Sequence, residues 1–252
     1  MLENLDKIDW GSLRHCNGPA NNIPNLLQDL LSKDKKTQSS AILQLFDNIW
    51  HHGTVYEASA QAVPFLYEIL ESPSCFERFS VVWLLGAIAN GTSEPPVNHS
   101  EKNEEMIWAK NAHGAVRLGV KTILGLLDEK DMDLRLPVVL LLASLSEEAA
   151  QITPVLSSML LTEKNAEARA GFGLALALLG VFRVEAFRSE STLLPFLLIE
   201  TLAKACMQDE TMKASVYLTI EECFLATMEK KDKDWLFDEK ALLESPPHLN
   251  IN

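Results

Sequence analysis

The chain has 252 residues, 47% of them hydrophobic and 23% charged, and its formal net charge is −13. So acidic a surface repels nucleic acid and anionic membranes, which bind proteins through clustered cations. No apolar run reaches the ~20 residues of a membrane-spanning helix, and the acidic N-terminus lacks a signal-peptide pattern, so we expect a cytoplasmic protein.

Pairs of helical stretches recur along the sequence. Each pair begins with an apolar stretch, and a second stretch follows 14 to 18 residues later. The first stretches are marked by Pro24, Pro64, Lys121, Pro154 and Pro195, and the second by Gln38, Arg78, Arg135, Arg169 and Lys213. A period of roughly 35 to 45 residues with two helices per unit is typical of an α-solenoid, in which each unit packs on its neighbours.

We predict five helical hairpins in chain order, followed by a capping helix. The hairpins cover residues 23–51, 55–90, 104–145, 149–180 and 190–226, and the acidic cap covers 229–245. Pro24 suits a first helical turn, and Gly91 suits a helix C-cap. The buried faces of the first two hairpins follow helical spacing: Ala41, Ile42, Leu45, Phe46 and Ile49, then Ala58, Ala62, Phe65, Leu66, Ile69 and Leu70.

An inserted segment at residues 91–103 interrupts the period. Its paired prolines and polar residues predict an exposed loop. Insertions in repeat arrays emerge as surface loops, often on the binding face. The alternative is that this insertion is a tolerated surface loop with no role in binding. A Gly-x-Gly sequence at residues 171–173 follows no strand, so we interpret it as close helix packing and not as a phosphate-binding loop.

The sequence contains no local signature of catalysis, metal binding or cofactor binding. His51 and His52 are adjacent, so on a helix they point ~100° apart and cannot easily share an ion. A position at a helix end explains them plainly. The four cysteines are widely spread and are expected to be free thiols. We therefore predict no catalytic residue, no metal and no cofactor.

Several short sequences from Ile8 to Leu70 resemble the N-terminal part of bacterial HEAT-repeat proteins. They are Ile8-Asp9-Trp10, Leu13-Arg14-His15, Gly18-Pro19-Ala20, Ile23-Pro24, His52-Gly53-Thr54-Val55-Tyr56 and Ala62-Val63-Pro64-Phe65-Leu66. The resemblance implies an all-α, right-handed α-solenoid of about five HEAT-like hairpins, with the second helices lining its concave side. It implies no catalytic residue. The chain departs from the pattern at Gln38, where HEAT second helices usually carry a basic residue, and at Lys121, which replaces a proline.

Three functions fit these features. The first is a non-enzymatic protein-binding scaffold for a basic protein, whose narrower form is an immunity-type inhibitor of a basic toxin, as found among HEAT-like proteins. Opposite fields would speed that encounter, although acidity can also serve solubility alone. The second is a HEAT-like DNA glycosylase that uses Trp50, Trp83 and Trp108 with Glu77 or Asp47. The third is a regulatory adaptor that recruits an enzyme.

The predicted contact surface combines aromatic and polar residues of the first half of the chain, because Trp, Tyr and Arg are favoured interface anchors. It comprises Trp50, His51, Tyr56, Glu57, Glu77 and Arg78, together with Glu94, Glu101, Glu104 and Glu105 of the inserted loop. Trp50 and Tyr56 flank a turn between helices, where we expect both to be exposed.

Overall fold

The protein is mostly helical, which agrees with the all-α part of the predicted fold class. The computed structural model describes residues 2–93, 102–128 and 132–164 together with 171, 172, 175, 176 and 179, and it describes only the backbone at 102–106, 132, 133 and 136. Chain contacts divide the molecule into two compact units, Met1–Ile152 and Thr153–Asn252. The expected hairpin at 190–226 and the expected cap at 229–245 lie outside the described residues.

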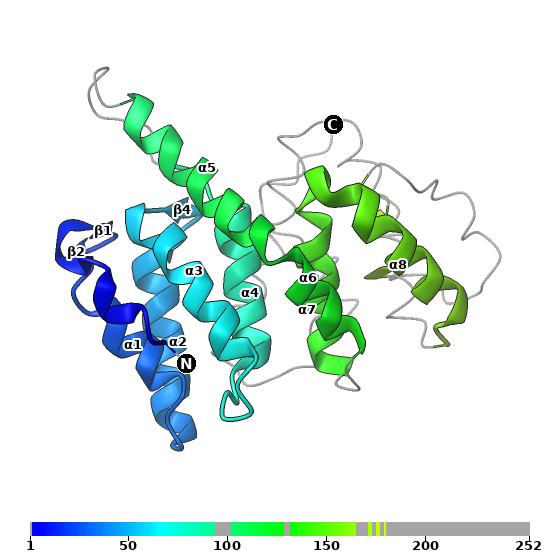
Figure 1. Ribbon diagram of the computed structural model, residues 1–252, viewed down its shortest axis with the longest axis horizontal. Coiled ribbons are helices and arrows are strands. Elements are labelled where there is room, and N and C mark those ends of the chain that lie inside the picture. Colours follow the sequence, from blue (N-terminus) through cyan, green and yellow to red (C-terminus); the bar gives the residue numbers. More distant parts are fainter. Residues whose placement is uncertain are drawn as a thin grey trace, which may run out of the picture. The chain divides into compact units, whose positions relative to one another are not determined.

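The first unit consists of helices that follow one another in pairs (Figure 1). The α-helices of the described residues are α1 (Ile23–Asp29), α2 (Lys35–Ile49), α3 (Glu57–Leu70), α4 (Arg78–Ala89), α5 (Lys102–Leu118), α6 (Val120–Gly125), α7 (Met132–Ala143) and α8 (Ala149–Thr162). The short 3-10 turns are η1 (Leu5–Lys7), η2 (Trp10–Ser12), η3 (Leu126–Asp128) and η4 (Ser146–Glu148). Helix α3 packs on α1 and α5, and α4 packs on α2, α5 and α7.

Local signals explain most of the helix ends. Asp34 caps α2, because its carboxylate accepts hydrogen bonds from the backbone N–H groups of Lys36 and Thr37. Helix α2 therefore begins at Lys35, earlier than the marker Gln38 implies. Pro24 lies in the first turn of α1 as predicted. Pro64 and Pro154, by contrast, lie inside α3 and α8, so the recurring proline does not mark the same helical position in each hairpin.

The predicted apolar faces form the core. Every member of the two predicted stripes on α2 and α3 is buried. Helix α4 is buried along nearly its whole length, from Ser80 to Ala89 with only Gly86 more accessible. Its position among α2, α3, α5 and α7 explains why its sequence carries no charge after Arg78.

Gln38 joins the first two hairpins through its side-chain amide. The side chain is fully buried, and its Nε2 donates to the carbonyl oxygens of Ser32 and Ser74, both at 2.6 Å. Its Oε1 accepts from the backbone N–H of Phe76 at 2.8 Å. Gln38 on α2 thus forms hydrogen bonds with the backbone of the loop between α3 and α4, in the second hairpin. A polar side chain is tolerated in the core when its hydrogen bonds are satisfied in this way.

Two β-hairpins that the sequence analysis did not predict lie at the ends of the helices. Strand β1 (Arg14–His15) pairs with β2 (Gly18–Pro19), and β3 (Trp50–His51) pairs with β4 (Thr54–Val55), both antiparallel. His52 and Gly53 form the second turn with φ of 47° and 88°, as a two-residue hairpin turn requires. The prediction that His51 and His52 end a helix is therefore wrong, because α2 ends at Ile49.

Gly91 has a different role from the one predicted. The backbone at Gly91 does not adopt positive φ, so it is not a left-handed C-cap. An added Cβ would overlap Cγ1 of Val55. The glycine is needed because α4 ends against β4, where Thr92 accepts from Val55 N (2.9 Å) and donates to Gly53 O (2.7 Å).

Among the described helices, none is by itself long and apolar enough to cross a bilayer. In that described part of the chain, one bent pair, Pro137–Ala143 and Ser146–Thr162, passes the test when its two members are counted together.

Candidate partner-binding surface

The two β-hairpins of the first unit lie at the same end of the helices, which we call the hairpin end. Cys16 N donates to Asn48 O at 2.9 Å, and Asn17 Nδ2 donates to Asn48 Oδ1 at 3.1 Å. Arg14 N donates to Glu57 Oε2 at 3.1 Å. These bonds fix the first hairpin to the end of α2 and to the first turn of α3.

Helix α5 adds an aromatic side chain to this end. The Cζ atom of Arg14 lies 5.7 Å from the ring centroid of Trp108, a cation–π contact. Arg14 is exposed and Trp108 is half-buried. The neighbouring Ile107 is also exposed (49%). The hairpin end therefore presents an arginine, an indole and an aliphatic side chain from two distant parts of the chain.

His15 is a structural residue of the same end. It is buried, and its Nδ1 accepts from Asn17 N at 2.9 Å. The hydrogen-bond partners therefore assign the proton to Nε2, which donates to Asn22 Oδ1 at 2.9 Å. Because both ring nitrogens are used within the fold, His15 is not available to a ligand.

Three of the predicted contact residues come together at the hairpin end. His51, Tyr56 and Glu57 lie there and are half-buried. Trp50 is only 5% exposed and packs edge-on against Phe46, with the ring centroids 6.2 Å apart. The prediction that Trp50 is exposed is wrong, because its strand turns the indole back onto α2.

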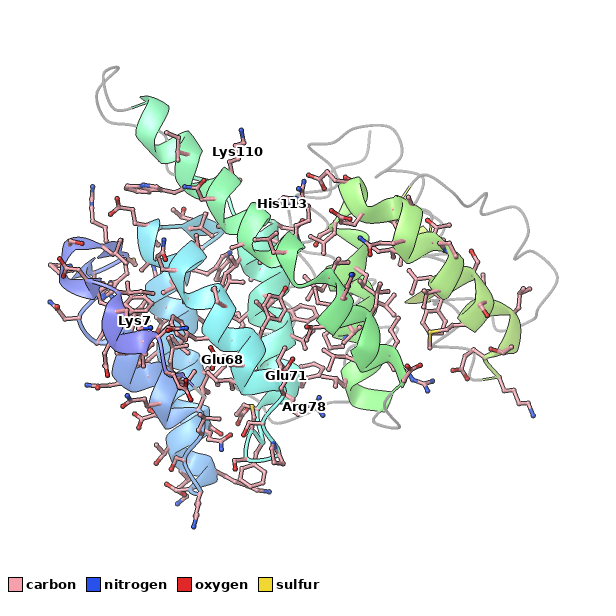
Figure 2. The ribbon with its side chains drawn as sticks, in the orientation of Figure 1. Lys7, Glu68, Glu71, Arg78, Lys110 and His113 are labelled. Atoms are coloured by element: carbon pink, nitrogen blue, oxygen red, sulfur yellow. The ribbon has the colours of Figure 1, made fainter. Side chains whose placement is uncertain are left out.

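Glu77 and Arg78 lie at the opposite end of α4 from the hairpins (Figure 1). A helix of 12 residues is ~18 Å long, so these two residues do not share one surface with Tyr56. In Figure 2, Lys110 of α5 lies in the upper part of the view and Arg78 in the lower part. The Glu77 carboxylate accepts from the hydroxyls of Ser39 (2.5 Å) and Ser80 (2.9 Å), which ties the start of α4 to α2.

The acidic residues of the insertion are only partly described. Glu94 and Glu101 lie outside the described residues. Glu104 and Glu105 belong to α5, so the predicted loop ends earlier than expected, because the helix already begins at Lys102. Thr92, two residues before Glu94, is bonded to the β3–β4 hairpin.

Two ion pairs connect α5 to η4. His113 Nε2 lies 3.0 Å from Glu147 Oε1, and Arg117 Nε lies 3.2 Å from Glu148 Oε1. The other ring nitrogen of His113 lies 2.8 Å from Ala89 O. Both of these atoms are acceptors, so His113 makes both bonds at once only when it is doubly protonated.

The pKa of Glu147 reflects this setting. Partial burial disfavours the charged carboxylate, but the hydrogen bond from its own backbone N–H and the charge of His113 outweigh burial and lower the pKa of Glu147 below its ordinary value.

Burial raises the pKa of the Cys75 thiol to about 11. Cys75 is therefore protonated at neutral pH, which argues against a nucleophilic role.

Among the residues whose placement the structure describes, no three His, Cys, Asp or Glu side chains gather closely enough to hold a metal ion.

The contacts that sequence reasoning missed are Arg14–Trp108 and His113–Glu147. Each joins residues more than thirty positions apart, so no local pattern could have indicated them.

No family model matches the chain, and no curated protein or solved structure is significantly similar to it.

Proposed function

We propose that this protein is a non-enzymatic protein-binding scaffold, a right-handed α-solenoid of about five HEAT-like hairpins. The observation that carries the proposal is the serial packing in the first unit, where α3 packs on α1 and α5, and α4 packs on α2 and α7. Gln38 and Glu77 add polar links between the first and second hairpins. Arrays of this kind expose long surfaces suited to macromolecular partners.

The net charge of −13 favours a basic protein as the partner. In its narrower form, the proposal is an immunity-type inhibitor that covers a basic toxin, in the cytoplasm of the producing cell. A regulatory adaptor that recruits a basic enzyme makes use of the same features, and only the identity of the partner separates the two.

The DNA glycosylase alternative has lost part of its support. It needs aromatic side chains free to stack on a base, yet Trp50 and Trp83 are 5% and 7% exposed. Binding of duplex DNA would also require several cations to neutralise phosphates, and the recurrent Arg78 is half-buried at the start of α4.

The proposal is tested by affinity capture from a native lysate with the full-length protein as bait, followed by binding measurements with the purified captured protein. We expect a basic protein that binds with one-to-one or another fixed stoichiometry. An unrelated protein of equal net charge serves as the control bait. Capture of nothing beyond this control, or of acidic proteins only, contradicts the proposal. A toxin-like gene beside the gene for this chain supports the narrower form, and its absence removes that form.

A further inference from the structure

Arg14 has an unusual setting for an exposed arginine. The strand that carries it is fixed, because its backbone N–H donates to Glu57 Oε2 at 3.1 Å. Its guanidinium lies over the Trp108 ring, with Cζ 5.7 Å from the centroid. Within the described part of the chain, the guanidinium donates to no carboxylate or carbonyl oxygen. Its donor groups are therefore available at the surface.

A guanidinium that contacts an aromatic ring can still bind a carboxylate with two parallel hydrogen bonds from its N–H groups. The ring also restricts the arginine before binding, which lowers the entropy lost on binding. Arg and Trp are the residues most enriched in binding hot spots. Ile107, which is 49% exposed beside Trp108, adds apolar surface next to the charge.

We propose that Arg14 and Trp108 form an anchor for a single carboxylate, an Asp or Glu side chain presented by a protein partner whose surface is otherwise basic. The net charge of −13 disfavours a polyanionic partner. A partner with one carboxylate among many cations can bind the guanidinium through the carboxylate and the acidic rest of the molecule through its cations. This inference rests on the proposed function, since it specifies the chemistry of the partner.

The test uses a displayed library of random 12-residue peptides, selected on the full-length protein against an unrelated acidic protein as control. We expect the enriched peptides to combine one Asp or Glu with flanking Lys or Arg. The Kd of the best synthetic peptide should rise at least about tenfold for Arg14→Gln, as for a hot-spot residue. Arg14→Lys should weaken binding almost as much, because lysine keeps the charge and loses the fork.

Lys110→Gln is the matched control, since it removes one exposed positive charge from α5. It should change the Kd less than about twofold, as surface charges usually do. Replacing the peptide's Glu by Gln should weaken binding to the native protein and have little further effect on Arg14→Gln. Such non-additivity identifies a direct pair. Arg14→Gln should leave the urea midpoint unchanged, because Arg14 is exposed.

Two results would overturn the anchor: enriched peptides without an Asp or Glu side chain, or a Kd that Arg14→Gln does not change. If the enriched peptides are basic, either result leaves the scaffold proposal intact. If no peptide is enriched over the control while a basic protein is captured from the lysate, the anchor alone fails. If neither binds, both proposals fail.

Discussion

The Tyr67 hydroxyl of α3 donates a 2.7 Å hydrogen bond to the carbonyl oxygen of Val116 in the last turn of α5. The same carbonyl accepts from Gly119 N at 3.0 Å, where α5 ends and α6 begins. Burial raises the pKa of Tyr67, so the phenol remains a donor at neutral pH. A Cβ added at Gly119 would come too close to Cζ of Tyr67 and so would overlap the ring. The ring of α3 therefore occupies the break between α5 and α6.

Gly119→Ala should destabilise the protein because the methyl group and the Tyr67 ring cannot occupy the same space. We expect the free energy of unfolding to fall by about 1–3 kcal/mol, as in other overpacked sites. Gly114→Ala, inside α5 with open space around it, should instead stabilise by up to about 1 kcal/mol through helix propensity. Urea unfolding measures both. Equal effects of the two alanines would contradict the role of Tyr67, and Tyr67→Leu should reduce the cost of Gly119→Ala.

Gln38→Met should be costly even though methionine has nearly the same shape. It leaves the Phe76 N–H and the carbonyl oxygens of Ser32 and Ser74 without the partner that Gln38 supplies. We expect a loss of about 2–4 kcal/mol, since each unsatisfied buried group costs about 1–3 kcal/mol. Amide hydrogen exchange at Phe76 should also accelerate. Gln44→Met, on the exposed face of α2, is the control, and a similar loss there would count against the link between hairpins.

Glu147→Gln should change the pH dependence of stability. The folded-state pKa of Glu147 is lowered. Its ionised form therefore stabilises the native protein fully when the pH is above the unfolded-state pKa of about 4.3. This stabilisation is lost as the pH falls through the lower folded-state pKa. Because Glu147 is 47% exposed, the contribution is under about 1 kcal/mol.

The measurement is urea unfolding of native protein and Glu147→Gln at about pH 6 and about pH 3. The variant should be less stable at the higher pH, and the difference should shrink at the lower one. Glu71→Gln is the matched control, because it removes an exposed glutamate at the C-terminal cap of α3, outside this pair. A Glu147→Gln difference that does not vary with pH would contradict the stabilising pair with His113.

Reversing the charges of Glu94, Glu101, Glu104 and Glu105 to lysine should weaken binding to a captured basic partner and make the affinity less sensitive to salt. A matched fourfold reversal elsewhere on the acidic surface separates a local effect from the change in net charge. Unchanged affinity would remove the insertion from the contact surface.

The helices were predictable because each carries its own periodic signal. The apolar stripes from Ala41 to Ile49 and from Ala58 to Leu70 are buried as expected, and α8 begins at residue 149, where the hairpin predicted at 149–180 begins. The β3–β4 hairpin was missed although its two-residue turn between His51 and Thr54 ends in glycine, because the apolar pattern of α2 continues into Trp50.

The candidate surface was less predictable than the fold, because contacts between distant residues decide it. Trp50 and Tyr56 look alike in the sequence, yet the strand directs Trp50 onto Phe46 and leaves Tyr56 half-buried at the surface. Nothing near Arg14 in the sequence indicates Trp108, since that contact depends on how α5 crosses α3. Gln38 was noticed only as a departure from a basic pattern, and its three bonds explain why an amide suits that position.

The association rate of the purified captured partner, measured from low to physiological salt, tests the central claim most directly. An acidic scaffold that attracts a basic protein should bind fast at low salt and more slowly, by about tenfold or more, as salt is raised toward 0.15 M. A rate that does not change with salt, or no specific partner at any salt concentration, would contradict the account.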